Sequence, residues 1–211
     1  MPRFHLGLTA AELAVFSRLT TPIKIQNFLD CFPINWEKRG ETYMSPRRVL
    51  AARKMHCFEG ALIAALALWL RGEPALLMDL KTKGDEDHVV ALYKRQGYWG
   101  AISKSNHATL RWRDPVYQTP RELALSYFHE YFANSTKQKS LRSFSEPLNL
   151  KKCGAGWVTA EADLDELALA LDRSKHHSIF PPKNARLIRP ADTMECRAGR
   201  LVEWKKSHPR T

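Results

Sequence analysis

Residues 53–70 read Arg-Lys-Met-His-Cys-Phe-Glu-Gly-Ala-Leu-Ile-Ala-Ala-Leu-Ala-Leu-Trp-Leu, and this stretch decides the fold. From Cys57 onward it is almost entirely apolar for more than two helical turns, which predicts a helix buried on all sides. The first N–H groups of a helix have no partner within it, and the helix dipole makes that end positive. Cys57 is therefore favoured as a reactive thiolate. The alternative is a buried, inert cysteine, which is common for free thiols.

Residues 85–103 predict a β-hairpin that follows this helix. An acidic turn leads into a β-branched and aromatic strand that begins at His88, and a second strand returns and ends at Ser103. Gly97 supplies the positive φ that a tight turn requires. If the turn is centred between Gln96 and Gly97, Ser103 is a diagonal neighbour of His88 on the same face. The histidine is then either a general base or ion-pair partner of the cysteine, or an ordinary half-exposed strand residue.

These elements together resemble the transglutaminase-like superfamily, a group of papain-related cysteine enzymes that use a Cys-His-Asp triad. The resemblance covers about residues 45–105, under a third of the chain, and rests on short motifs. It implies that Cys57 is the nucleophile and His88 its imidazole partner, with the W-x-x-x-D segment of the family matched by residues 99–103. The implied activity is that of a hydrolase or acyltransferase acting on an amide or ester carbonyl.

The third member of the triad departs from the family pattern. Ser103 stands where the family carries an aspartate, and a serine orients an imidazole without offering it a charge. Asn106 and Asp114 are further candidates for this role, although residues 113–115 are more typical of a loop turn. Three alternatives follow: another residue fills the role, the pair works without it, or catalysis has been lost.

Three other residues near the proposed chemistry have expected roles. Gln26 is an outside candidate for a side-chain donor to an oxyanion, beside the backbone N–H groups at the head of the 57–70 helix. Glu59 is expected to support the helix N-terminus rather than take part in chemistry. His56 is expected to be a weaker partner of the cysteine than His88, because adjacent side chains on a helix point apart.

The fold expected from these patterns is α+β. A central buried helix headed by Cys57 packs against a small antiparallel sheet, and other helices surround them. The length of 211 residues fits a single domain. Its expected parts are N-terminal helices over residues 1–44, the core over 45–132 and a C-terminal annex over 150–211.

Shorter elements are expected around this core. Thr9, Thr21 and Ser45 are typical N-cap residues, so a helix is expected to begin after each of them. His176 and His177 are expected to cap the C-terminus of a preceding helix. The remaining expectations are a strand over 75–80, a helix that starts near 118 and carries aromatic residues as far as 131, a mobile surface loop over 134–146, a helix over 163–171 and an edge strand over 186–190.

The cysteines and the apolar runs define an expected setting. The four cysteines are scattered and never form C-x-x-C, so we expect reduced thiols, no metal site and no cofactor. No secretory signal is expected, and the apolar run over residues 61–70 is shorter than the ~20 residues that span a bilayer. These features predict a cytoplasmic protein without membrane contact.

The net charge of +11 leaves three function classes open. A cysteine enzyme would act on a protein, peptide or small acyl substrate, and the basic charge makes an acidic substrate or partner one expectation. A catalytically inactive transglutaminase-like binding protein is the first alternative. A basic nucleic-acid-binding protein is the second, suggested by the interleaved residues 111–113, although the basic residues are dispersed rather than clustered.

Overall fold

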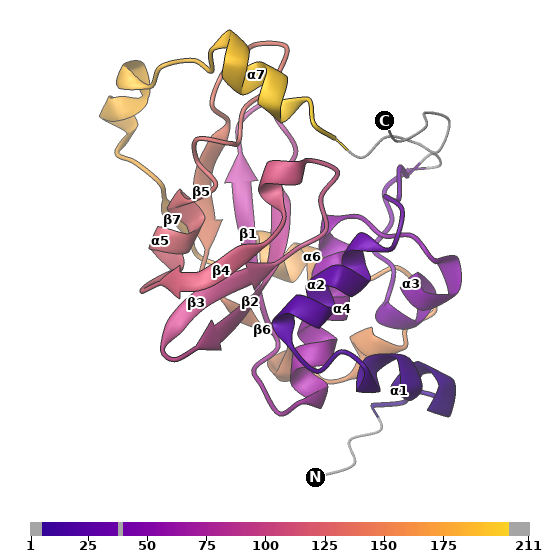
Figure 1. Cartoon of the computed structure of the whole chain (residues 1–211). Coiled ribbons are helices and arrows are strands. Elements are labelled where there is room, and N and C mark those ends of the chain that lie inside the picture. Colours follow the sequence, from indigo (N-terminus) through magenta and orange to yellow (C-terminus); the bar gives the residue numbers. More distant parts are fainter. Residues whose placement is uncertain (1–5, 38–39, 203–211) are drawn as a thin grey trace.

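The computed structural model describes residues 6–37 and 40–202, and the helix predicted from the sequence lies at its centre. This helix, α4 (Cys57–Leu70), is buried continuously from Phe58 to Leu68. A helix with no polar face gains most when it is covered on every side, and here helices cover one part of its surface and a sheet covers another (Figure 1).

The helices that precede α4 begin where their capping residues predict. They are α1 (Ala10–Ser17), α2 (Pro22–Asp30) and α3 (Pro46–Ala52). The side-chain oxygens of Thr9, Thr21 and Ser45 each accept a hydrogen bond from a backbone N–H three residues later. Both α2 and α3 also start with proline, whose fixed φ suits the first helical position. α2 and α3 pack against α4.

The sheet is antiparallel and larger than the three strands expected. Its order is β4-β3-β2-β1-β5-β7, and a short strand, β6, also pairs with β1. Its strands are β1 (Leu76–Thr82), β2 (His88–Arg95), β3 (Tyr98–Ile102), β4 (Arg113–Tyr117), β5 (Leu141–Ser145), β6 (Leu148–Asn149) and β7 (His176–Ser178). Because α4 packs against β2 and β1, the α+β architecture with a cysteine-headed helix on the sheet is confirmed.

The β2–β3 hairpin has the register that the sequence predicts. Arg95 pairs with Tyr98 and Ala91 pairs with Ile102, so the turn is centred between Gln96 and Gly97. Both turn residues have positive φ, 50° and 87°, as a tight two-residue hairpin requires. This register brings the chain just after β3 alongside the start of β2.

Both faces of the sheet are buried. On β2, Val89 and Ala91 belong to the core around α4, whereas Val90 and Leu92 belong to a second core. The second core is covered by α5 (Pro120–Leu125) and by the aromatic residues that follow it (Figure 1). This burial explains why β2 reads as a nearly continuous apolar run rather than an alternating one.

The prediction of a surface loop over residues 134–146 is wrong in its second half. Residues 141–145 form β5, which pairs with β1 and buries Leu141 and Phe144. Ser145 is buried too, because its hydroxyl accepts a hydrogen bond from the backbone N–H of Asp79. The serines and basic residues of this stretch mislead because their polar groups find partners inside the protein.

Several expected elements end or continue differently. Residues 113–115 lie in β4, and α5 ends at Leu125 rather than continuing toward Tyr131. The C-terminal annex is joined to the main sheet: α6 (Asp165–Asp172) packs on β1, and His176 and His177 form part of β7 instead of capping α6. Residues 182–187 are a 3-10 helix, so no edge strand forms there, and α7 (Thr193–Gly199) follows.

Candidate functional site

The first turn of α4 packs very closely against the residues that follow β3. A Cβ atom built on Gly60 would lie 2.6 Å from Cβ of Lys104, so a side chain larger than hydrogen at position 60 requires the backbone to shift. Ser103 and Lys104 are both fully buried in this contact. Gly60 therefore lets the end of β3 lie directly against the first turn of the helix that carries Cys57.

Gln26 on α2 fixes the backbone of Ser103 from the other side. Its Nε2 donates to the Ser103 carbonyl at 3.0 Å, and its Oε1 accepts from the Ser103 N–H at 3.1 Å. The same Nε2 also donates to Asp30. Both ends of the Gln26 amide are thus occupied, so this residue positions Ser103 and is not placed as an oxyanion donor.

His88 is oriented by neutral groups. Its Nε2 lies 3.0 Å from the carbonyl oxygen of Leu110 and 3.2 Å from Oγ of Ser103. The Ser103 hydroxyl also lies within reach of the Leu110 and Arg111 carbonyl oxygens, at 3.0 and 3.2 Å. Because a carbonyl oxygen only accepts, Nε2 carries the hydrogen, and Nδ1 is the ring nitrogen without it in the neutral form. Ser103 therefore orients the ring, and within the described residues the partners of its Nε2 are a hydroxyl and a carbonyl rather than a carboxylate.

Cys57 occupies the first position of α4 and is partly exposed to a pocket. Burial raises the pKa of the Cys57 thiol, but hydrogen bonding with His56 and His88, and the positive charge of both rings, hold this pKa well below its ordinary value. The helix N-terminus adds to this effect. The thiolate is thus favoured by the N-terminus of α4, by His56 just before this helix and by His88 at the start of β2.

The expectation that His56 is a weaker partner of Cys57 than His88 rests on adjacent helical side chains pointing apart, and the structure does not support this reason. His56 is the N-cap residue of α4 and has extended backbone angles, φ −104° and ψ −168°, so the helical spacing of side chains does not apply to it. Its Nε2 lies 2.7 Å from the carbonyl oxygen of Thr42, and its ring interacts with Cys57. The H-x-x-E spacing of His56 and Glu59 is the sequence signal for this cap, since Glu59 accepts from the His56 N–H at 3.0 Å.

The pocket above Cys57 measures about 690 Å³. Both histidines line it, together with Lys104, Asn106 and Tyr131. Five acidic residues also line it: Glu37, Asp85, Glu86, Asp87 and Glu130. The expectation of an acidic substrate rests on the net charge of the whole chain. The pocket wall differs from the chain as a whole, because it is rich in carboxylates.

The two other candidates for the third role lie in different places. Asn106 lines the pocket. Asp114 lies on β4, where it is exposed and accepts a hydrogen bond from Trp112 Nε1 at 2.8 Å. Asp114 is therefore engaged outside the pocket, and among Ser103, Asn106 and Asp114 the residue with a hydrogen-bond contact to His88 is Ser103.

Within residues 6–37 and 40–202, no group of three or more His, Cys, Asp and Glu side chains is placed to hold a metal ion. In the same described part of the chain, no helix combines the length and apolar character needed to cross a bilayer. No protein-family model matches this sequence, and no curated protein matches it either.

Proposed function

We propose that the protein is a cysteine hydrolase or acyltransferase of transglutaminase-like type, in which Cys57 and His88 act on an amide or ester carbonyl. The observation that carries this proposal is the position of Cys57 at the start of α4, partly exposed in a pocket that His56 and His88 also line. Hydrogen bonding with both rings lowers the pKa of its thiol. Perturbed titratable groups gathered in a cleft are typical of catalytic sites. The substrate is a protein, a peptide or a small acyl compound.

The reaction follows from these groups in two halves. The Cys57 thiolate attacks the carbonyl carbon, a C–S bond forms, and the carbonyl electron pair moves onto oxygen. The electron pair on oxygen then re-forms the C=O bond, and the bond to the leaving group breaks. The leaving group takes a proton from His88, and the acyl group remains on Cys57 as a thioester. Water or an acceptor amine or hydroxyl next attacks the thioester and gives its proton to His88, and the C–S bond breaks to return the thiolate.

Backbone N–H groups at the head of α4 are the proposed donors to the oxyanion. The helix cannot satisfy its first N–H groups internally, and the Cys57 N–H belongs to the residue that carries the nucleophile. A well-placed donor of this kind contributes about 3 to 4 kcal/mol to transition-state stabilisation. Gln26 is excluded from this role because Ser103 and Asp30 occupy its amide.

The neutral surroundings of His88 favour one alternative, an inactive binding protein with the same fold. Leu110 and Ser103 orient the ring but do not stabilise an imidazolium by charge. The two proposals differ in turnover, since a binding protein need not release an acyl group from Cys57. The cellular setting proposed for either is the cytoplasm, because Cys31, Cys57, Cys153 and Cys196 are all free thiols.

A burst experiment with p-nitrophenyl acetate tests the proposed function. We expect about one p-nitrophenolate per chain to be released rapidly, followed by slower steady turnover, since a thioester on Cys57 forms first and is then hydrolysed. Intact-mass and peptide measurements should locate one acetyl group on Cys57, and Cys57→Ala should remove both phases. A burst without turnover would favour the inactive alternative, and labelling of Cys31 or Cys153 instead would contradict the proposal.

A further inference from the structure

We propose that His56 is a second, carboxylate-backed partner of Cys57, one that holds the thiolate while His88 moves the proton. This inference rests on the proposed function, because it divides the work of the same site between two histidines. His56 is a positioning residue in this account, since it acts on the substrate only through the sulfur of Cys57.

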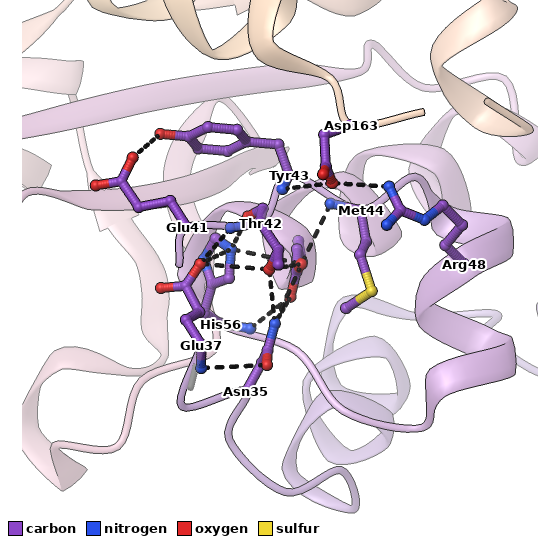
Figure 2. Close-up of polar contacts among 10 residues, drawn as sticks. Asn35, Glu37, Glu41, Thr42, Tyr43, Met44, Arg48, His56 and Asp163 are labelled. Carbon is purple, nitrogen blue, oxygen red and sulfur yellow. Dashed lines mark hydrogen bonds and ion pairs between the residues drawn. The ribbon is translucent and has the colours of Figure 1, made fainter. Parts of the chain in front are cut away.

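One carbonyl oxygen and two carboxylates lie close to Nε2 of the His56 ring. Nε2 donates to the Thr42 carbonyl oxygen at 2.7 Å, and the ring also forms a side-chain hydrogen bond with Cys57. Two carboxylates lie beside the same Nε2: Oε1 of Glu59 at 3.5 Å and Oε1 of Glu37 at 3.6 Å. Figure 2 shows Thr42, Glu37 and His56 gathered in one network of polar contacts. The His56 ring therefore has two carboxylates near Nε2 and also interacts with the thiol of Cys57.

Glu59 is fixed in place as a buried acceptor. It is fully buried, and it accepts hydrogen bonds from the backbone N–H groups of His56 at 3.0 Å and Met44 at 3.2 Å and from the Thr42 hydroxyl at 3.0 Å. Asn35 Nδ2 lies 3.4 Å from its second oxygen. A buried carboxylate that accepts several hydrogen bonds is held in place, and its charge acts on the neighbouring ring.

These contacts have the effect expected on the titration of His56. Burial lowers the pKa of His56, but hydrogen bonding to Cys57, the negative charges of Cys57 and Glu59, and the Thr42 carbonyl raise it overall to about 9. The only other ionisable ring packed against it is Tyr43 in the described part of the chain, and burial raises the pKa of Tyr43 to about 12. The raised pKa of His56 and the lowered pKa of Cys57 together favour an imidazolium beside a thiolate.

The two histidines therefore differ in the groups near Nε2. His56 has carboxylates at its far nitrogen, whereas His88 has a carbonyl and a hydroxyl. A ring backed by carboxylates keeps its proton and stabilises an adjacent anion. His88, which is held by a carbonyl and a hydroxyl, is the ring that remains for the proton transfers of the proposed reaction. Ser103 offers no negative charge to His88, and in our proposal the carboxylates of Glu37 and Glu59 support the site instead, by stabilising a positive His56 beside Cys57.

The test measures the alkylation of Cys57 by iodoacetamide as a function of pH, with peptide-level quantification. His56→Gln keeps a donor for the Thr42 carbonyl but removes the positive charge. We expect the rate at pH 6 to fall at least about tenfold and the midpoint for Cys57 to rise by about one unit or more. His177→Gln is the matched control, because His177 lies on β7 and is bound to Glu146; its profile should equal that of the native protein.

An unchanged Cys57 profile in a folded His56→Gln variant would overturn the inference. If that variant does not fold, the nitrogen chemical shifts of the imidazoles in the native protein decide. A His56 ring protonated on both nitrogens at pH 7 supports the inference, and a neutral ring overturns it. Failure of the proposed function is separately visible: a native protein without an acylation burst, but with a low Cys57 midpoint that His56→Gln raises, would reject the enzyme and support the role of His56.

Discussion

Replacing His88 by alanine is expected to lower steady turnover of p-nitrophenyl acetate by about 10²- to 10⁴-fold, the usual contribution of a positioned acid–base group. The loss should fall on hydrolysis of the thioester, because the attacking water needs a base and His88 is the proposed acid–base group beside Cys57. The initial burst should remain, since p-nitrophenolate leaves without a proton and His56 still favours the thiolate. Rapid-mixing measurements of burst and steady rates separate the two steps.

Ser103→Ala is the matched control for this variant. It removes one hydrogen bond to Nε2 but leaves the Leu110 carbonyl in place. A single hydrogen bond of this kind is worth about 1 kcal/mol, or roughly fivefold in rate. If His88→Ala and Ser103→Ala had equally small effects on turnover, His88 would not be the acid–base group.

Replacing Glu59 by alanine is expected to lower the free energy of unfolding by about 3 kcal/mol or more. The substitution leaves the N–H groups of His56 and Met44 and the hydroxyl of Thr42 without their buried acceptor, and it removes the carboxylate beside the His56 ring. Loss of one partner from a buried charged network is among the most destabilising changes in proteins. Urea unfolding of the two proteins gives the difference directly.

Glu41→Ala provides a control from the neighbouring segment. Glu41 is exposed and accepts one hydrogen bond, from the Tyr43 hydroxyl at 2.9 Å (Figure 2). A surface carboxylate of this kind contributes about 0 to 1 kcal/mol. A Glu59→Ala protein as stable as the Glu41→Ala protein would show that the buried network does not hold the head of α4 in place.

The central helix and the hairpin could be predicted because each has a strong local signal. An apolar run with a polar residue before it leaves little choice but a buried helix from Cys57 onward. Gly97 identifies the position of the hairpin turn. That position sets the register of β2 and β3, which brings His88 close to the end of β3. Ser103 could be found beside His88 for the same reason.

The remaining features depend on contacts between segments that are distant in sequence. β5 carries serines and an arginine, and it is a strand because it pairs with β1. The carboxylate of Glu37, which lies 3.6 Å from Nε2 of His56, comes from a loop before α3. Gln26 binds Ser103 from α2, across 77 residues of sequence. Periodicity and motif spacing carry no information about such pairings.

The most direct test of the account is the pH at which Cys57 becomes a thiolate in the native protein. Iodoacetamide labelling from pH 4 to 10, quantified for each cysteine in the same digest, gives this value, with the exposed Cys31 and Cys153 as references for labelling efficiency. The account predicts a Cys57 midpoint well below the ~8.5 of a free thiol. A midpoint at or above that value would contradict it, since Cys57 would then be a buried thiol without a partner that activates it.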